Sequence, residues 1–147
     1  MSAPVLPWLA GAVIQLLRED AAFMATCGSR VDSRAPSDVG RPFALVRVAG
    51  NVHEPGSGGI SWLPLLQVEG RSPVLTDRDV DGVVWEIAAN AARVLATVDM
   101  KRWRNIGYTA RLTDGPAPLP LDTTRGTSMP LHGAYCRAEL SVQVVPT

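Results

Sequence analysis

Three aspartates at alternate positions have the spacing that comes closest to a known chemical site. Asp77, Asp79 and Asp81, followed by Gly82, match the opening of a calcium-binding loop, which has acids at its first, third and fifth positions and glycine at its sixth. The loop also needs a bidentate acid at its twelfth position, where this chain has Ala88. We therefore interpret the aspartates as part of the first turns of a helix.

The remaining candidates for chemistry are weaker. The glycine-rich run at 56–59 lacks the lysine and the following helix of a phosphate-binding loop. The histidines, His53 and His132, and the cysteines, Cys27 and Cys136, are too scattered for a zinc site, and Cys27 has no base near it in sequence. We expect buried free thiols, no catalytic residue, no metal and no cofactor, and therefore not an enzyme.

Composition narrows the class of protein. The 147 residues fit a single domain, 1–147, and 46% of them are hydrophobic, enough for a core. The 14 basic and 14 acidic residues balance, which disfavours general binding to nucleic acid or to an anionic membrane. The apolar N-terminal run has no basic start and is broken by Pro7, and no stretch is long enough to span a membrane. We expect a soluble intracellular product.

The strongest secondary-structure signal is an amphipathic helix over residues 77–98. Thr76 is expected to cap it, with Asp79 in its first turn. Shorter helices are predicted over 7–18, begun by Pro7, and over 21–27, capped by Asp20 and ended by Gly28 as a left-handed cap. The basic run 101–104 is interpreted as cations at the end of the long helix. The apolar stripe of that helix comprises Val80, Val83, Val84, Ile87, Ala91, Val94, Leu95 and Val98.

Alternating segments predict the strands. Four main strands are expected over residues 43–49, 60–69, 105–113 and 133–145, with a short extended piece at Val31. Residues 51–59 and the proline-rich stretch 114–131 are expected to be projecting loops. The predicted fold is α+β: a largely antiparallel β-sheet of about four main strands packed against the long amphipathic helix and the N-terminal helix, with extended loops.

The order of these elements resembles the tail terminator proteins of long-tailed bacteriophages, also called tail completion or tail-to-head joining proteins. In that family an arginine- and proline-containing segment precedes a strand that begins with proline and an aromatic residue and ends in glycine. The matching positions here are Arg30, Val31, Arg34 and Pro36 in the first segment, and Pro42, Phe43, Val46 and Gly50 in the second.

The resemblance implies a structural role in the virion. Such proteins are expected to form a hexameric homo-oligomeric ring on the head-proximal end of a non-contractile tail. The ring caps the tube and ends its polymerisation, and the implied partners are the tail tube protein and the head–tail connector or stopper protein. DNA passes through the lumen without sequence-specific binding. The family carries no catalytic residues, so none are transferred to this chain.

The interface residues are expected in the loops and on the outer face of the long helix. Exposed tryptophan and arginine side chains are typical of protein contacts, and Arg47, Arg111 and Arg137 are candidates to bridge subunits. The predicted interface residues are His53, Glu54, Trp85, Arg93, Arg111, Pro118, Pro120 and Arg125.

Three alternatives remain open. The chain is compatible with another ring of the head–tail connector or a minor tail protein. A small cytoplasmic ligand-binding or enzymatic domain would require a pocket with convergent polar groups. A nucleic-acid-binding module is disfavoured by the balanced charge.

Overall fold

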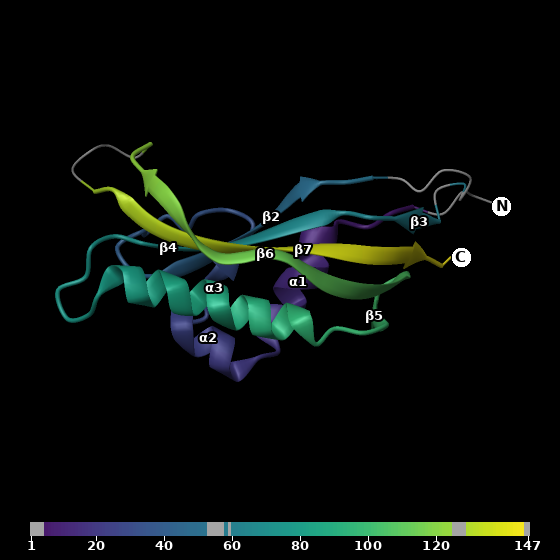
Figure 1. Cartoon of the computed structure of the whole chain (residues 1–147), viewed down its shortest axis with the longest axis horizontal. Helices are drawn as coiled ribbons and strands as arrows, with labels where there is room; N and C mark the ends of the chain where they lie inside the picture. Colours follow the sequence, from purple (N-terminus) through teal and green to yellow (C-terminus); the bar gives the residue numbers. More distant parts are fainter. Residues whose placement is uncertain (1–4, 53–57, 59, 125–128, 146–147) are drawn as a thin grey trace.

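A computed structural model describes residues 5–52, 58, 60–124 and 129–145. These residues form one curved sheet with helices on one of its faces (Figure 1). Among them, no helix combines the length and apolar character needed to cross a membrane. The helices are α1 (Leu9–Arg18), α2 (Ala21–Cys27) and α3 (Val80–Ala96). The strands are β1 (Val31–Asp32), β2 (Phe43–Gly50), β3 (Ser61–Trp62), β4 (Leu65–Ser72), β5 (Lys101–Trp103), β6 (Ile106–Asp122) and β7 (Leu131–Val144).

The sheet is larger than expected, and it is mixed. In the described part of the chain, the strand order is β1-β2-β4-β7-β6-β5, with β3 paired beside β4 on β7. β1 runs parallel to β2, pairing Val31 with Ala44, and the other pairings are antiparallel. The prediction of about four main strands in a largely antiparallel sheet is therefore wrong. Three of the seven strands have only two or three residues, too few for an alternating pattern to reveal.

The predicted loop over residues 114–131 is also wrong, because much of it belongs to a long β6–β7 hairpin. β6 continues to Asp122 and β7 begins at Leu131. Pro116 and Pro120 lie where the register between the strands shifts, so no ladder hydrogen bond is required of them. Pro118 lies opposite Ala134 in regular pairing, and its nitrogen has to face the free edge of β6 because proline has no N–H to donate.

Helix α3 occupies most of the predicted segment, but its first turn differs. The helix begins at Val80, and its N-cap is Asp79 rather than Thr76: the Asp79 carboxylate accepts a hydrogen bond from the Asp81 N–H at 3.1 Å. The predicted stripe is buried, including Val98 just after the helix. The stripe lies very close to β4 at one point, where a Cβ on Gly70 would be 2.7 Å from the Cβ of Ile87.

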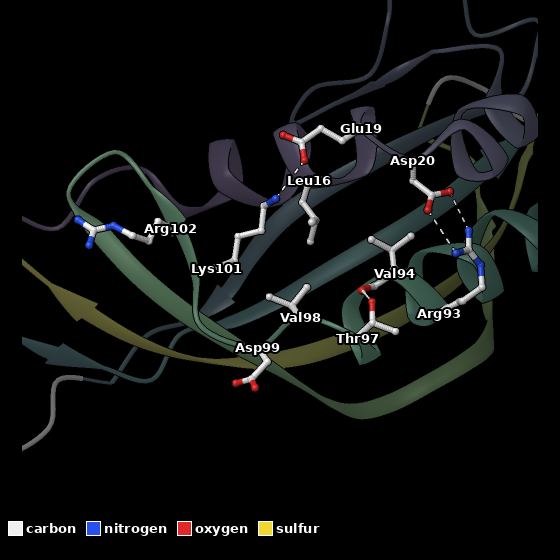
Figure 2. Close-up of a pocket in the computed structure, with 10 residues that line it drawn as sticks. All are labelled: Leu16, Glu19, Asp20, Arg93, Val94, Thr97, Val98, Asp99, Lys101 and Arg102. Carbon is white, nitrogen blue, oxygen red and sulfur yellow. Dashed lines mark hydrogen bonds and ion pairs between the residues drawn. The ribbon is translucent and has the colours of Figure 1, made fainter.

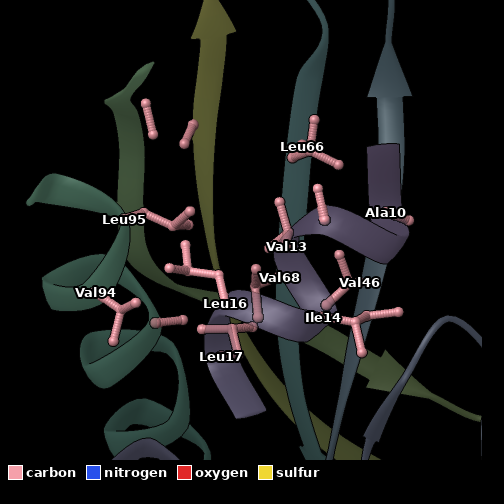
Figure 3. Close-up of a cluster of buried hydrophobic side chains, with 14 of the residues drawn as sticks. Ala10, Val13, Ile14, Leu16, Leu17, Val46, Leu66, Val68, Val94 and Leu95 are labelled. Carbon is pink, nitrogen blue, oxygen red and sulfur yellow. The ribbon is translucent and has the colours of Figure 1, made fainter. Parts of the chain in front are cut away.

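The main core lies between the sheet and helices α1 and α3. Figure 3 shows Val13 and Leu17 of α1 against Leu66 and Val68 of β4, with Leu95 of α3 beside them. All five side chains are fully buried. Burial of this apolar surface is the main force that holds the helical layer on the sheet.

Of the two shorter helices, only α2 has a side-chain N-cap and a left-handed glycine at its end. Helix α1 starts at Leu9, two residues after the predicted Pro7. For α2 the prediction is confirmed: Asp20 accepts a hydrogen bond from the Phe23 N–H at 2.9 Å, and Gly28 ends the helix in the left-handed conformation with φ of 58°.

The basic run after α3 is a strand rather than a helix end. Residues 101–103 form β5 and pair with the start of β6. The chain then turns at Arg104, which has a φ of 50°. Trp103 packs on α1, where the indole rings of Trp103 and Trp8 both lie over Gly11. The interpretation of these residues as helix-end cations is therefore wrong.

Two predicted strands differ in detail. The apolar face expected for β2 does not extend to its end, because the Val48 side chain is 42% exposed. The predicted strand 60–69 divides into β3 and β4, since Leu63 and Pro64 interrupt the pairing, and β4 then continues to Ser72. The predicted loop 51–59 lies mostly outside the described residues.

Candidate interface surfaces

The sheet face opposite the helices carries a network of charged and polar side chains, which we call the free face. The strand register places Gln67 of β4 between Arg47 of β2 and Arg137 of β7. Arg137 Nε donates to Gln67 Oε1 at 2.7 Å, and Gln67 Nε2 donates to Glu69 Oε1 at 2.7 Å. Side-chain hydrogen bonds therefore join β7 to β4 in addition to the backbone ladder.

Glu69 is the centre of this network. Its side chain is 8% exposed, and a carboxylate this buried requires compensation by cations or donors. Arg71 Nε lies 3.5 Å from Glu69 Oε2, and Arg47 Nε lies 3.6 Å from Glu69 Oε1. Arg71 also crosses β7 and donates to the carbonyl oxygen of Pro120 in β6 at 3.0 Å. The network thus extends across four strands.

Further pairs continue along β6 and β7. The Tyr135 hydroxyl donates to Asp114 Oδ2 at 2.7 Å, and this hydrogen bond raises the pKa of Tyr135. Arg137 lies over the Tyr135 ring, 5.2 Å from its centroid, and Arg111 pairs with Glu139 at 3.1 Å. The three arginines proposed to bridge subunits therefore all have partners within the chain, so they stabilise the free face itself.

A hollow of about 530 Å³ lies on the helical side of the molecule (Figure 2). Two ion pairs flank it: Arg93 of α3 binds Asp20 at 2.7 Å, and Lys101 of β5 binds Glu19 at 3.1 Å. The hydrogen bond from Arg93 lowers the pKa of Asp20, and the hydrogen bond from Lys101 lowers the pKa of Glu19. Each charged partner is already neutralised by the other, so the two pairs bridge elements and are not positioned as reactive groups.

The predicted interface residues do not converge on one site. Trp85 is 44% exposed on the outer side of α3, and Arg93 lies in the same helix beside the hollow. Arg111, Pro118 and Pro120 are exposed along β6. His53, Glu54 and Arg125 lie outside the described residues.

One exposed apolar surface was not predicted from the sequence. We call it the tryptophan end. The Asn105 side chain donates to the carbonyl oxygen of Val5 at 3.0 Å, and the Asn105 carbonyl oxygen accepts from the Val145 N–H at 2.7 Å, so residues distant in sequence meet here. Arg104 lies 4.5 Å from the centroid of the Trp103 ring. The tryptophan end consists of the exposed Trp8 beside the partly buried Trp103. Met100 and Val145 lie around a separate hollow with Arg102 and Gly107.

A second apolar surface lies at the far end of the hairpin. Leu121 and Met129, which we call the hairpin tip, are 52% and 46% exposed. The only sequence signal for either surface was a large apolar side chain within a polar or proline-rich segment. That signal does not show which residues come together, because the contacts join the N-terminal segment, β5 and the end of β7.

Buried groups offer no alternative site in the described residues. Cys27 and Cys136 are free and buried, as predicted, and burial raises the pKa of Cys27 and brings that of Cys136 to about 12. Both thiols are therefore protonated near neutral pH and unsuited to nucleophilic attack. Within the same residues, no group of three or more His, Cys, Asp or Glu side chains is arranged to hold a metal ion.

The chain matches no known protein family model and no curated protein. Its function is therefore inferred from the sequence resemblance and from the surfaces described above.

Proposed function

We propose that this protein is a structural virion component that forms a ring, with six copies as the expected number, at the head-proximal end of a long phage tail. The ring caps the tail tube and ends polymerisation of the tube protein. It then binds the connector or stopper protein of the head, while DNA passes through its lumen. The subunits are made in the host cytoplasm, and neither a catalytic step nor a cofactor is part of the proposal.

The segment that carries the family resemblance supports this proposal because it is one structural unit. Val31 of β1 pairs with Ala44 of β2, so the two halves of the motif lie side by side. Arg30 holds the intervening loop: its guanidinium group donates to the backbone carbonyl of Asp38 and lies 3.8 Å from the Asp38 carboxylate. The arginine of the motif therefore has a structural role in shaping the loop between the two strands.

The observation on which the proposal chiefly depends is the division of the sheet into two unlike faces. One face is covered by the helices, and Figure 1 shows the β6–β7 hairpin extending beyond them. The free face carries paired charges on β2, β4, β6 and β7, beside a small buried cluster of Val39, Phe43, Leu45 and Leu131. Extended surfaces with aromatic and arginine side chains are typical of protein contacts. The formal net charge of zero also suits a ring through which DNA slides, since such a ring makes few attractive contacts with phosphates.

The first experiment measures the mass of the full chain alone and after incubation with purified tail tubes. Native mass spectrometry is expected to show a species about six times the subunit mass of 15.7 kDa, either free or released from tubes. Electron microscopy should show density on one tube end and no further tube growth. A chain that stays monomeric in both conditions, or tubes that continue to lengthen, would contradict the proposal.

The free face is tested with one charge reversal and one matched control. Arg111→Glu reverses a side chain that is 75% exposed on the free face, whereas Arg78→Glu reverses one that is 54% exposed in the loop before α3. We expect the first variant to bind tubes or connector more weakly and the second to behave as wild type. Equal behaviour of the two variants would remove the free face from the proposal.

The position in the neck is tested by the order of addition. A terminator binds headless tail tubes, whereas another connector ring binds DNA-filled heads first. Binding to heads alone, with no binding to tubes, would favour the connector-ring alternative.

A further inference from the structure

A small hollow of about 280 Å³, with three arginines in its wall, lies at the β1 edge of the sheet. Its wall is formed by the end of α1, the residues that follow α2, β1 and the loop after β1. The first segment of the family resemblance contributes four residues to this wall: Arg30, Val31, Arg34 and Pro36. That segment therefore builds a recess as well as a strand pair.

The positive charge in this hollow exceeds the negative charge. In the described part of the chain, neither Arg18 nor Arg34 forms an ion pair. Arg18 donates to the carbonyl oxygen of Val31 at 3.0 Å, and this neutral acceptor leaves the charge of the guanidinium group in place. The wall contains one acid, Asp32, whose Oδ1 accepts from the Ser33 N–H at 2.7 Å.

The third arginine, Arg30, is the most buried of the three in its contacts. Its side chain is 16% exposed, and among the described residues its buried Nε has no hydrogen-bond partner. The Asp38 carboxylate lies 3.8 Å from Arg30 Nη1, but it is 65% exposed and also lies 3.7 Å from Arg41 Nε. A cation this buried ordinarily requires a close counter-charge of its own. The hollow beside Arg30 is therefore suited to an added anion.

We propose that this hollow, which we call the arginine pocket, binds the carboxylate of an acidic side chain on a partner protein. Guanidinium groups are planar and match the two oxygens of a carboxylate. Ala35, Pro36 and Ala44 supply apolar wall against which the aliphatic part of an aspartate or glutamate side chain packs. Identification of the partner as a protein of the phage neck rests on the proposed function, whereas the carboxylate preference rests on the pocket alone.

Two aspartates favour a single carboxylate over the backbone of DNA. Asp32 lies in the wall of the arginine pocket, and Asp38 lies beside Arg30. Duplex DNA carries one negative charge per roughly 1.7 Å of its axis, so phosphates on both sides of a bound phosphate would approach these acids. An acidic side chain brings one charged group, which the three arginines outnumber.

The first test measures binding of two blocked tripeptides to the full chain at low salt. The probes are acetyl-Glu-Asp-Glu-amide and its neutral counterpart, acetyl-Gln-Asn-Gln-amide, and the readout is the NMR shift of each backbone amide. The acidic peptide is expected to shift the amides of residues 29–35, and the neutral peptide is expected to leave them unchanged. Absence of a shift with the acidic peptide, or equal shifts with both peptides, would overturn the proposal.

Two matched substitutions test which arginine is responsible. Arg34→Gln removes an exposed arginine of the pocket, and Arg102→Gln removes an exposed arginine of β5; in the described residues neither side chain has an ion pair. Arg34→Gln is expected to weaken binding of the acidic peptide about tenfold, the effect of losing one charge-assisted hydrogen bond. Arg102→Gln should bind as wild type does, and circular dichroism checks that both variants fold. Equal weakening by the two substitutions would reduce the effect to net charge and overturn the pocket.

A short DNA duplex is the competing probe. The duplex is expected to leave the amides of residues 29–35 unshifted. Shifts of these amides by DNA that Arg34→Gln abolishes would assign the pocket to a phosphate and overturn the carboxylate proposal.

Ring assembly and tube capping are measured on the same proteins, so that the two proposals are judged separately. If the chain binds the acidic peptide but neither forms rings nor caps tubes, the arginine pocket stands and the proposed function fails. If the chain caps tubes but does not bind the peptide, the proposed function stands and the pocket fails.

Discussion

The guanidinium group of Arg71 lies directly over Gly133 on the neighbouring strand. A Cβ on Gly133 would be 2.7 Å from Arg71 Nη1 and 2.8 Å from Cζ, so the absence of a side chain there is what allows the arginine to lie flat across β7. From this position Arg71 reaches both Glu69 on its own strand and the Pro120 carbonyl oxygen on β6. One glycine therefore makes room for a contact that spans three strands.

Gly133→Ala is expected to displace Arg71 and lower the free energy of unfolding by about 1–3 kcal/mol, because the displaced arginine leaves Glu69 with a weaker partner. Urea denaturation measures the change. Gly107→Ala is the matched control in the same sheet, since a Cβ there meets no atom within 4 Å. In an Arg71→Met background, Gly133→Ala should lower the free energy of unfolding by a much smaller amount. An equal cost in both backgrounds would show that Arg71 is not the reason for the glycine.

Gly70→Ala is expected to lower the free energy of unfolding by roughly 1–3 kcal/mol or more, because the added methyl group meets the Ile87 Cβ at 2.7 Å and the Val84 carbonyl oxygen at 2.9 Å. Neither atom is at the flexible end of a side chain, so α3 has to move away from β4. Gly82→Ala, in α3 with no atom within 4 Å, should instead raise stability by about 0.5–1 kcal/mol. Thermal unfolding distinguishes the two, and a tolerated Gly70→Ala would contradict the close packing.

Alkaline pH is expected to destabilise the fold. Burial raises the pKa of Tyr108 from 10.0 to about 12 and that of Cys136 from 9.0 to about 12. Between the two values of each group, the folded state holds a proton that the unfolded state has released, so stability falls as pH rises from about 9 to 12. Denaturant midpoints across this range measure the slope.

Tyr108→Phe should reduce that slope. In the described part of the chain, the Tyr108 hydroxyl is buried without a hydrogen-bond partner, so phenylalanine should also preserve or raise stability at neutral pH. Tyr135→Phe provides the comparison, because its hydroxyl donates to Asp114 and its loss should lower stability at neutral pH. An unchanged alkaline slope in Tyr108→Phe would show that Tyr108 does not titrate in this range.

Asp20→Ala is expected to lower the unfolding temperature more than Glu19→Ala does. Asp20 both caps α2 through the Phe23 N–H and binds Arg93, whereas Glu19 binds Lys101 and Gln15 through side chains at the surface. The pKa of Asp20 is lowered, so its contribution is present above its ordinary pKa and is lost as pH falls. Thermal scans measure the unfolding temperatures of both variants at neutral and acidic pH. The difference between these two temperatures should be smaller at acidic pH.

Sequence periodicity located the segments with long regular patterns. The apolar stripe around Ile87 and Leu95 identified α3, and Asp20 with Gly28 marked both ends of α2. The incorrect predictions lie in segments where the local sequence pattern and the tertiary structure disagree. Pro116, Pro118 and Pro120 suggested a loop, yet β7 supplies a partner strand along which they fit at register shifts or at the free edge.

The residues that come together on the surface were harder to predict than the helices and strands. Trp85 was expected to be exposed because it lies opposite the apolar stripe, and it is. Trp8 and Trp103 are 95 positions apart in the numbering, and only the packing of β5 on α1 brings them together. The pairing of Arg47 with Glu69 depends on the register of β2 and β4, which residue types alone do not determine.

The prolines of β6 also protect the exposed edge of the hairpin from pairing with strands of other molecules. A long strand at the edge of a sheet ordinarily recruits strands from other chains, which leads to aggregation and fibrils. Here the outer edge of the hairpin is interrupted by register shifts at Pro116 and Pro120, and Pro118 turns toward it a nitrogen without hydrogen. The backbone of this edge is therefore poorly suited to pair with a strand of another molecule.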